Sequence, residues 1–227
     1  MHRLALTLAA LAAAACTDFA TPNQLERATI IAVVAEPPVV QPGDATELTV
    51  VVADATGVIE RPATWTLTET FPGVAPLGTL TGAGASATYR APTTLPDRGP
   101  DIPPIDTAAV TVDTADGRLT AIKAVAVVPT TTANPRITAL TVGGADATAA
   151  AVPVTRGQTV TVQVTTDPAT GDDARFAWYS PVGDIQYYQS NPCDLVVADD
   201  AVTGPLIVVV RDGQGGVVWR QIELQVP

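Results

Sequence analysis

The feature that most constrains the fold is a pattern of short segments in which apolar and polar residues alternate. Residues 159–164 (TVTVQV) place valines on one face and Thr or Gln on the other, and residues 221–226 (QIELQV) alternate in the same way. Successive side chains of a β-strand point to opposite faces, so each segment predicts a strand with one apolar and one polar side. Gly, Pro and Asp recur between the segments, as in turns. The sequence therefore predicts an all-β protein of antiparallel sheets packed as sandwiches.

An internal repeat relates the two halves of the chain. The matching pairs are 41–54 with 155–167, Trp65 with Trp178, and 109–129 with 206–227. Each half has the length of about 100 residues and the strand spacing that are typical of an immunoglobulin-like (Ig-like) sandwich. We therefore expect two tandem sandwiches over residues 28–129 and 136–227, joined by a linker over residues 130–135 (TTTANP).

Two stretches resemble known bacterial surface modules. Residues 208–226 (VVVRDGQGGVVWRQIELQV) resemble the last hairpin of PKD-like and related bacterial Ig-like domains. Residues 78–92 (GTLTGAGASATYRAP) resemble the turn and the Tyr-x-Ala-Pro strand of other bacterial Ig-like repeats. The resemblance implies tandem Ig-like architecture and says little about activity. Both halves lack the paired cysteines of antibody domains, so we expect Trp65 and Trp178 to pack against aliphatic side chains.

The first residues of the chain have the pattern of a secretory signal. His2 and Arg3 precede an apolar run from Leu4 to Ala15, which is shorter than the about 20 residues that span a bilayer. The run ends in small residues at Ala13–Ala15, directly before Cys16. This arrangement resembles the bacterial lipobox, in which the cysteine becomes the first mature residue and carries lipid. Ordinary secretory cleavage after Ala15 is the alternative.

The lipobox resemblance implies a location and a partner. We expect a signal peptide over residues 1–15, a lipidated Cys16, and a flexible tether over residues 16–27. More than one acyl chain gives stable anchoring, so the membrane itself is the first expected partner. Thr17 follows the cysteine in place of Asp, which by analogy with enterobacterial sorting favours the outer membrane. The expected location is the bacterial cell envelope.

Composition excludes several classes of function. The chain has 23 acidic and 12 basic residues, a net charge of −11, whereas a nucleic-acid-binding protein needs a basic surface. The single histidine, His2, would leave with the signal peptide, so the mature chain would contain no imidazole. Ser-His-Asp catalysis and His-ligated zinc are then excluded. Hydrolysis by a carboxylate pair is the remaining enzymatic hypothesis, but no fixed spacing singles out a pair. We expect a protein that is not an enzyme.

The chain contains two cysteines. If Cys16 is lipidated, Cys193 has no intrachain partner and is either a buried apolar residue or a free thiol. If the chain is secreted without lipid, a Cys16–Cys193 disulfide becomes possible.

An aromatic cluster in the second half supplies a candidate ligand site. Trp178 is expected to face the core, so its neighbour Tyr179 should point outward, and at least one of the adjacent Tyr187 and Tyr188 should be exposed. Exposed aromatic rings can stack on sugars or bind a protein partner. The alternative is that these rings pack in the core and at strand edges.

Acidic turns supply a candidate metal site, at Asp212 and at the pair Asp199 and Asp200. Calcium prefers carboxylate and carbonyl oxygens on adaptable loops, but Asp is also favoured in hairpin turns without any metal. No other cofactor is expected. The proline-rich stretch 87–106 is interpreted as an irregular surface loop, either a connector or a contact loop.

Together these patterns favour a structural, adhesion or protein-binding module of the cell envelope, anchored by lipid. The alternative is a carbohydrate-binding surface lipoprotein that uses the three tyrosines. The second partner is expected to be an envelope protein or a glycan whose identity the sequence does not give.

Overall fold

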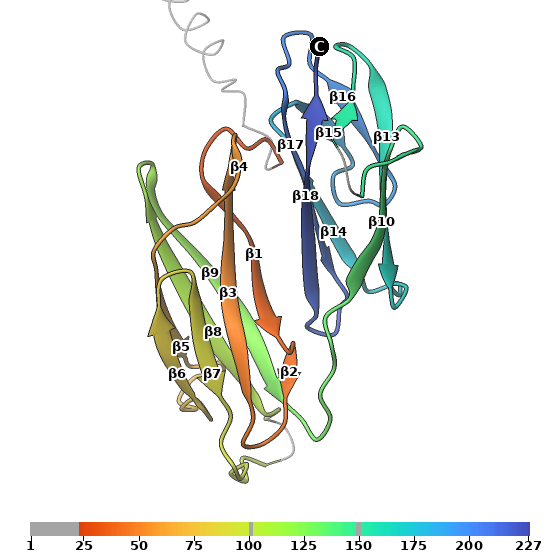
Figure 1. The fold of residues 1–227 in the computed structure, drawn as a ribbon. Coiled ribbons are helices and arrows are strands. Elements are labelled where there is room, and N and C mark those ends of the chain that lie inside the picture. Colours follow the sequence, from red (N-terminus) through yellow and green to blue (C-terminus); the bar gives the residue numbers. More distant parts are fainter. Residues whose placement is uncertain (1–22, 100–101, 149–150) are drawn as a thin grey trace, which may run out of the picture.

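A computed structural model describes residues 23–99, 102–148 and 151–227, and all of their regular structure is β-strand (Figure 1). The described residues form eighteen strands in four sheets, which stack in pairs as two sandwiches. The predicted all-β fold with tandem Ig-like sandwiches is confirmed. None of the described segments forms a helix that is long and apolar enough to cross a bilayer.

The first sandwich is formed by strands β1 to β9. One sheet has the order β1-β3-β7-β6, with β4 paired to β3, and the facing sheet has the order β2-β9-β8-β5. All pairs are antiparallel except the short parallel pair of β2 with β9. The strands are β1 (Thr29–Glu36), β2 (Val39–Val40), β3 (Ala45–Asp54), β4 (Gly57–Ile59), β5 (Ala63–Thr68), β6 (Thr79–Ala83), β7 (Ser86–Arg90), β8 (Ile105–Thr114) and β9 (Gly117–Val127).

The second sandwich repeats this topology. One sheet has the order β11-β10-β13-β16-β15, and the facing sheet has the order β12-β18-β17-β14, again with one short parallel pair, β12 with β18. The strands are β10 (Arg136–Val142), β11 (Ala145–Asp146), β12 (Val152–Pro153), β13 (Thr159–Asp167), β14 (Arg175–Tyr179), β15 (Gly183–Gln186), β16 (Cys193–Val197), β17 (Gly204–Arg211) and β18 (Val217–Gln225).

Each sandwich buries one tryptophan in an apolar core. Trp65 packs among aliphatic residues of the first core, and its indole N–H donates to the carbonyl of Gly84 (3.1 Å). Trp178 is fully buried in the second core and donates to the carbonyl of Ser190 (3.0 Å). Both rings therefore pack without a disulfide, as expected, and each satisfies its one donor.

A buried carboxylate closes the proline-rich stretch of the first sandwich. Asp106, at the start of β8, accepts hydrogen bonds from the N–H groups of Leu77 and Gly78 and from the hydroxyl of Tyr89, all within 2.9 Å. Burial raises the pKa of Tyr89 above its ordinary value, and the hydrogen bond to Asp106 raises it further. The interpretation of residues 87–106 as an irregular surface loop is wrong at both ends, because Ser86–Arg90 form β7 and β8 begins at Ile105, and it did not include the role of Asp106.

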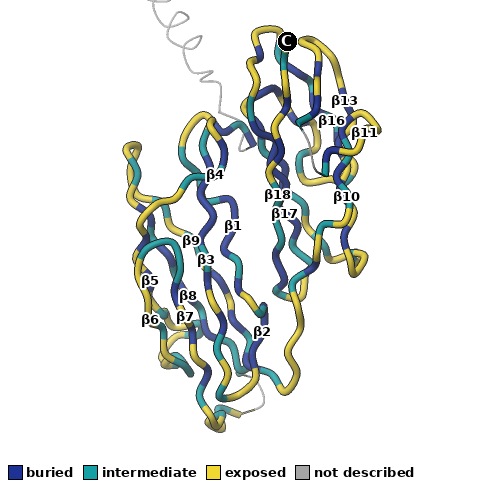
Figure 2. The backbone as a smooth tube through the Cα atoms, in the orientation of Figure 1, coloured by how far each residue is buried: buried dark blue, intermediate teal, exposed yellow. Residues whose placement is uncertain are grey.

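The two sandwiches lie side by side over part of their length and are offset along it (Figure 1). Strands β1 and β3 of the first face strands β17 and β18 of the second, and buried residues line both sides of the boundary (Figure 2). Val50–Ala53 on β3 and Pro205–Val210 on β17 are buried at every position, on both faces of their strands. We call this boundary the seam.

Candidate functional site

A third apolar cluster fills the seam. Its buried members come from the outer faces of β1 and β3 in the first sandwich, from β14, β17 and β18 in the second, and from the segment before β1. They are Leu25, Ile31, Ala32, Val51, Ala53, Ala177, Ile207, Val209 and Val217. Full burial of one Leu, Ile or Val side chain stabilises by about 1.5–3 kcal/mol, so this cluster holds the sandwiches together.

Side chains also cross the seam to satisfy backbone groups. Gln221 of β18 accepts a hydrogen bond from the N–H of Val58 (2.8 Å). Arg211 of β17 donates to the carbonyl of Ile31 on β1 (2.8 Å). Because β1 is an edge strand, its outward carbonyl would otherwise need water.

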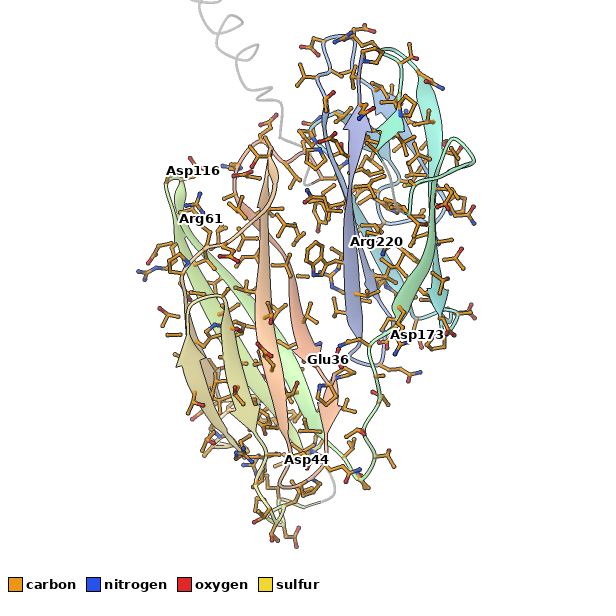
Figure 3. The ribbon with its side chains drawn as sticks, in the orientation of Figure 1. Glu36, Asp44, Arg61, Asp116, Asp173 and Arg220 are labelled. Carbon is orange, nitrogen blue, oxygen red and sulfur yellow. The ribbon has the colours of Figure 1, made fainter. Side chains whose placement is uncertain are left out.

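The linker residue Asn134 bonds to both sandwiches. Its amide group donates to the carbonyl of Ala35 (2.7 Å) and to the carboxylate of Glu36 (2.6 Å). Glu36 is the last residue of β1 and lies near the boundary between the sandwiches (Figure 3). Its carbonyl oxygen accepts from the N–H of Val217 (2.7 Å) at the start of β18. The linker thus connects the end of β1 to the start of β18 at one end of the seam.

The segment before β1 is attached to the second sandwich. The Asn23 side chain donates to the carbonyl of Ile185 (3.3 Å), and the Asn23 carbonyl accepts from the N–H of Ser180 (3.1 Å). Leu25 is fully buried in the seam. The prediction of a flexible tether over residues 16–27 is therefore wrong for Asn23 and Leu25, because Asn23 is bonded to the second sandwich and Leu25 is buried in the seam. The predicted signal peptide, Cys16 and the tether up to residue 22 lie outside the described residues.

A groove of about 430 Å³ opens beside the seam. Residues of β1 and β9, together with the β17–β18 hairpin, line it, and its charged members are Lys123, Arg175 and Arg211, with no carboxylate in the lining. The Lys123 ammonium donates to the carbonyl of Gly215 (2.5 Å). Burial lowers the pKa of Lys123, Asp212 opposes that shift, and Arg211 adds to it. The groove is therefore apolar with a cationic side, in a strongly acidic protein.

The three tyrosines do not form one exposed face. Tyr179 points away from Trp178, as its parity predicts, but it packs against the seam cluster, and burial raises its pKa. Tyr188 packs against the core of the second sandwich. Tyr187 alone presents its ring, with 81% of its surface exposed. Tyr179 thus points out of its own core as predicted, but the other sandwich covers it, so the three tyrosines do not form one exposed surface for a sugar.

The three candidate aspartates do not converge either. Asp199 and Asp200 precede β17 and Asp212 follows it, so a strand of eight residues, roughly 25 Å long, separates them. Asp212 accepts hydrogen bonds from the N–H groups of Gln214 (2.7 Å) and Gly216 (2.8 Å), which is the alternative role in the turn. Across the described ranges, no group of three or more His, Cys, Asp or Glu residues could hold a metal ion.

Cys193 lies in the second core with 5% of its surface exposed. Burial raises the pKa of its thiol to about 12, and the nearby Asp194 carboxylate adds to that shift. The thiol is therefore protonated and poorly reactive at neutral pH.

No family model and no curated protein matches the sequence. Solved structures that match in part include a chimeric titin Z1Z2–Z1Z2 tandem (TM-score 0.36, 16% identity, 88% of this chain and 100% of that chain). Another is the N-terminal Ig1-2 module of the Drosophila receptor protein tyrosine phosphatase DLAR (TM-score 0.34, 12% identity, 88% and 98%). A third is titin Z1Z2 in complex with telethonin (TM-score 0.27, 15% identity, 88% and 96%). All three TM-scores lie below 0.5, and these likenesses carry no conclusion about the role of this chain.

Proposed function

We propose that this chain is a lipid-anchored, non-enzymatic protein-binding module of the bacterial cell envelope. The observation that carries the proposal is the seam, which joins two Ig-like sandwiches and the segment before β1 into one unit. A module of this kind presents a fixed surface to a partner at a set distance from the membrane.

The attachment of Asn23 and Leu25 supports this role. If Cys16 is lipidated, six residues, 17–22, separate the anchor from Asn23, the first residue that the structure describes. Six extended residues reach at most roughly 20 Å, so the body would stay close to the membrane surface. Because the seam joins the two sandwiches, the anchor would then hold both of them near the membrane surface.

Binding is favoured over catalysis by the chemistry of the groove. Its lining combines aliphatic side chains with three cations and contains no acid, so no pair of carboxylates faces a substrate there. A pocket of this size and mixture suits recognition of an apolar, negatively charged group.

The anchor is tested by expressing the full chain in a bacterial host and comparing it with a Cys16→Ser variant. The native chain should sediment with membranes and show an intact mass that includes acyl chains on Cys16, whereas Cys16→Ser should lose both properties. A Cys193→Ser variant is the matched control and should remain acylated. Recovery of native protein with an unmodified N-terminus would refute the anchor.

A further inference from the structure

Strand β9 has an edge without strand pairing along most of its length, and β1 of the facing sheet lies close to it. Strand β9 pairs with β8 from Gly117 to Ala126, but on its other side β2 covers only Ala126 and Val127. No other described strand pairs with β9. An open edge presents unpaired N–H and C=O groups that can hydrogen-bond to a further strand.

The hydrogen-bond pattern shows which groups face outward. The N–H of Val127 donates to Pro104 on the β8 side (2.8 Å), and the N–H of Val128 donates to Val40 of β2 (2.8 Å). Because both backbone groups of a strand residue point to the same side and adjacent residues alternate, the even-numbered residues face away from β8. The uncovered outward residues are Arg118, Thr120, Ile122 and Ala124.

The groove lies along this edge. Ala121–Ala124 form one side of it, residues of β1 form another, and the β17–β18 hairpin forms its end. Ile122 has 71% of its surface exposed, which is unusual for an isoleucine in this protein. The edge therefore offers hydrogen-bonding backbone and apolar side chains at the same place.

The charged residues that line the groove are all basic, so they favour an acidic occupant. Arg175 donates only to the carbonyls of Asp172 and Ala174 in its own loop, so its guanidinium has unused donors. Arg211 and Lys123 bond to backbone carbonyls rather than to carboxylates. The one salt bridge among the described residues joins Arg118 to Asp113. Asp212 is the acid near Lys123, and its Oδ1 accepts the turn N–H groups.

From this geometry we propose that the open edge of β9 binds an extended, acidic segment of a partner protein as an added strand. Backbone groups of the segment would pair with Thr120, Ile122 and Ala124. Its apolar side chains would enter the groove against β1, and its carboxylates would meet Arg175 and Arg211. Main-chain pairing of this kind gives affinity, and the side-chain pocket gives specificity. The proposal rests on the proposed role as a protein-binding module and names the partner class.

The test uses the full chain in a non-ionic detergent and a fluorescent peptide of alternating Asp and Val, with an alternating Lys and Val peptide for comparison. Fluorescence anisotropy should show saturable binding of the acidic peptide alone. Two variants should weaken binding by about tenfold or more: Arg175→Glu, which reverses a charge, and Ile122→Pro, which removes an outward N–H that the sheet does not use. Circular dichroism should show that both remain folded, and Arg175→Glu suffices if Ile122→Pro does not fold.

Val202→Glu is the matched control, because Val202 is also 71% exposed but does not line the groove. It should bind the acidic peptide as the native chain does. Equal binding of the two peptides, no binding at millimolar concentration, or unchanged binding by Arg175→Glu would each overturn the proposal. None of these results changes the acylation of Cys16, so failure of this site is distinguishable from failure of the anchor.

Discussion

Leu25 provides the sharpest test of the seam. It precedes β1, belongs to neither sandwich core, and is 0% exposed within the seam cluster. Its replacement by alanine therefore removes apolar contacts from the seam while leaving both cores intact.

The expected loss follows from the burial. Leu→Ala at a fully buried position costs about 2–5 kcal/mol, and the lower part of that range applies where neighbours can close the cavity. Leu25 lies at the boundary between the two cores and not inside either one, so we expect the lower part of this range, about 2–3 kcal/mol, for Leu25→Ala.

Urea unfolding followed by tryptophan fluorescence measures this effect. Trp219 packs against the seam, whereas Trp65 and Trp178 report on the two cores, so variants that retain one tryptophan each separate the signals. In Leu25→Ala, the Trp219 signal should change at lower urea than in the native chain, and the two core transitions should move apart.

Leu140→Ala is the matched control, since Leu140 is equally buried but lies in the second core. It should lower the Trp178 transition itself. If Leu25→Ala changes the unfolding free energy by less than about 0.5 kcal/mol, Leu25 does not hold the seam and the argument from burial is wrong.

Asp106→Ala should lower the unfolding free energy by about 3 kcal/mol or more in chemical denaturation, because two backbone N–H groups and the Tyr89 hydroxyl lose their acceptor. Cys193 should resist iodoacetamide at pH 8 until urea is added, as read by intact mass. Because folding raises the pKa of Cys193 from 9.0 to about 12, its thiol stabilises the fold below pH 9 and loses that contribution as the pH rises toward 12, relative to a Cys193→Ala variant. Asn134→Ala should speed hydrogen exchange at the Val217 amide, which loses its acceptor, and unchanged exchange would contradict the role of the linker.

Strands with one buried face and one solvent-exposed face could be predicted from the sequence. Residues 159–164 lie in β13, where buried and exposed positions alternate without exception. The repeat between Trp65 and Trp178 also reflects equivalent positions, on β5 and β14. Alternation, turn residues and repeated spacing are patterns along the chain, so they can be recognised from the sequence alone.

The seam was missed because strands buried on both faces lose that alternation. Val50–Ala53 and Pro205–Val210 are continuous apolar runs, which is the pattern of a strand covered on two sides. Both runs therefore indicate strands that are covered on their outer face as well as on the face toward their own core. The same omission explains Tyr179, whose direction was predicted correctly while its surroundings were not.

The candidate sites depended on distances between loops, which spacing in the sequence does not supply. Asp199 and Asp212 are near in the sequence but lie at opposite ends of β17. Conversely, Lys123 and Arg211 come from different sandwiches and meet only because the seam brings β9 and the β17–β18 hairpin together. No local sequence pattern predicts that Lys123 and Arg211 line the same groove.

The attachment of Asn23 to Ser180 and Ile185 has a mechanical consequence. A force applied through the N-terminal chain reaches the second sandwich before it reaches β1. Peeling of the first strand from its sheet must then wait until Asn23 and Leu25 have been pulled free, so the load is shared by both halves of the molecule.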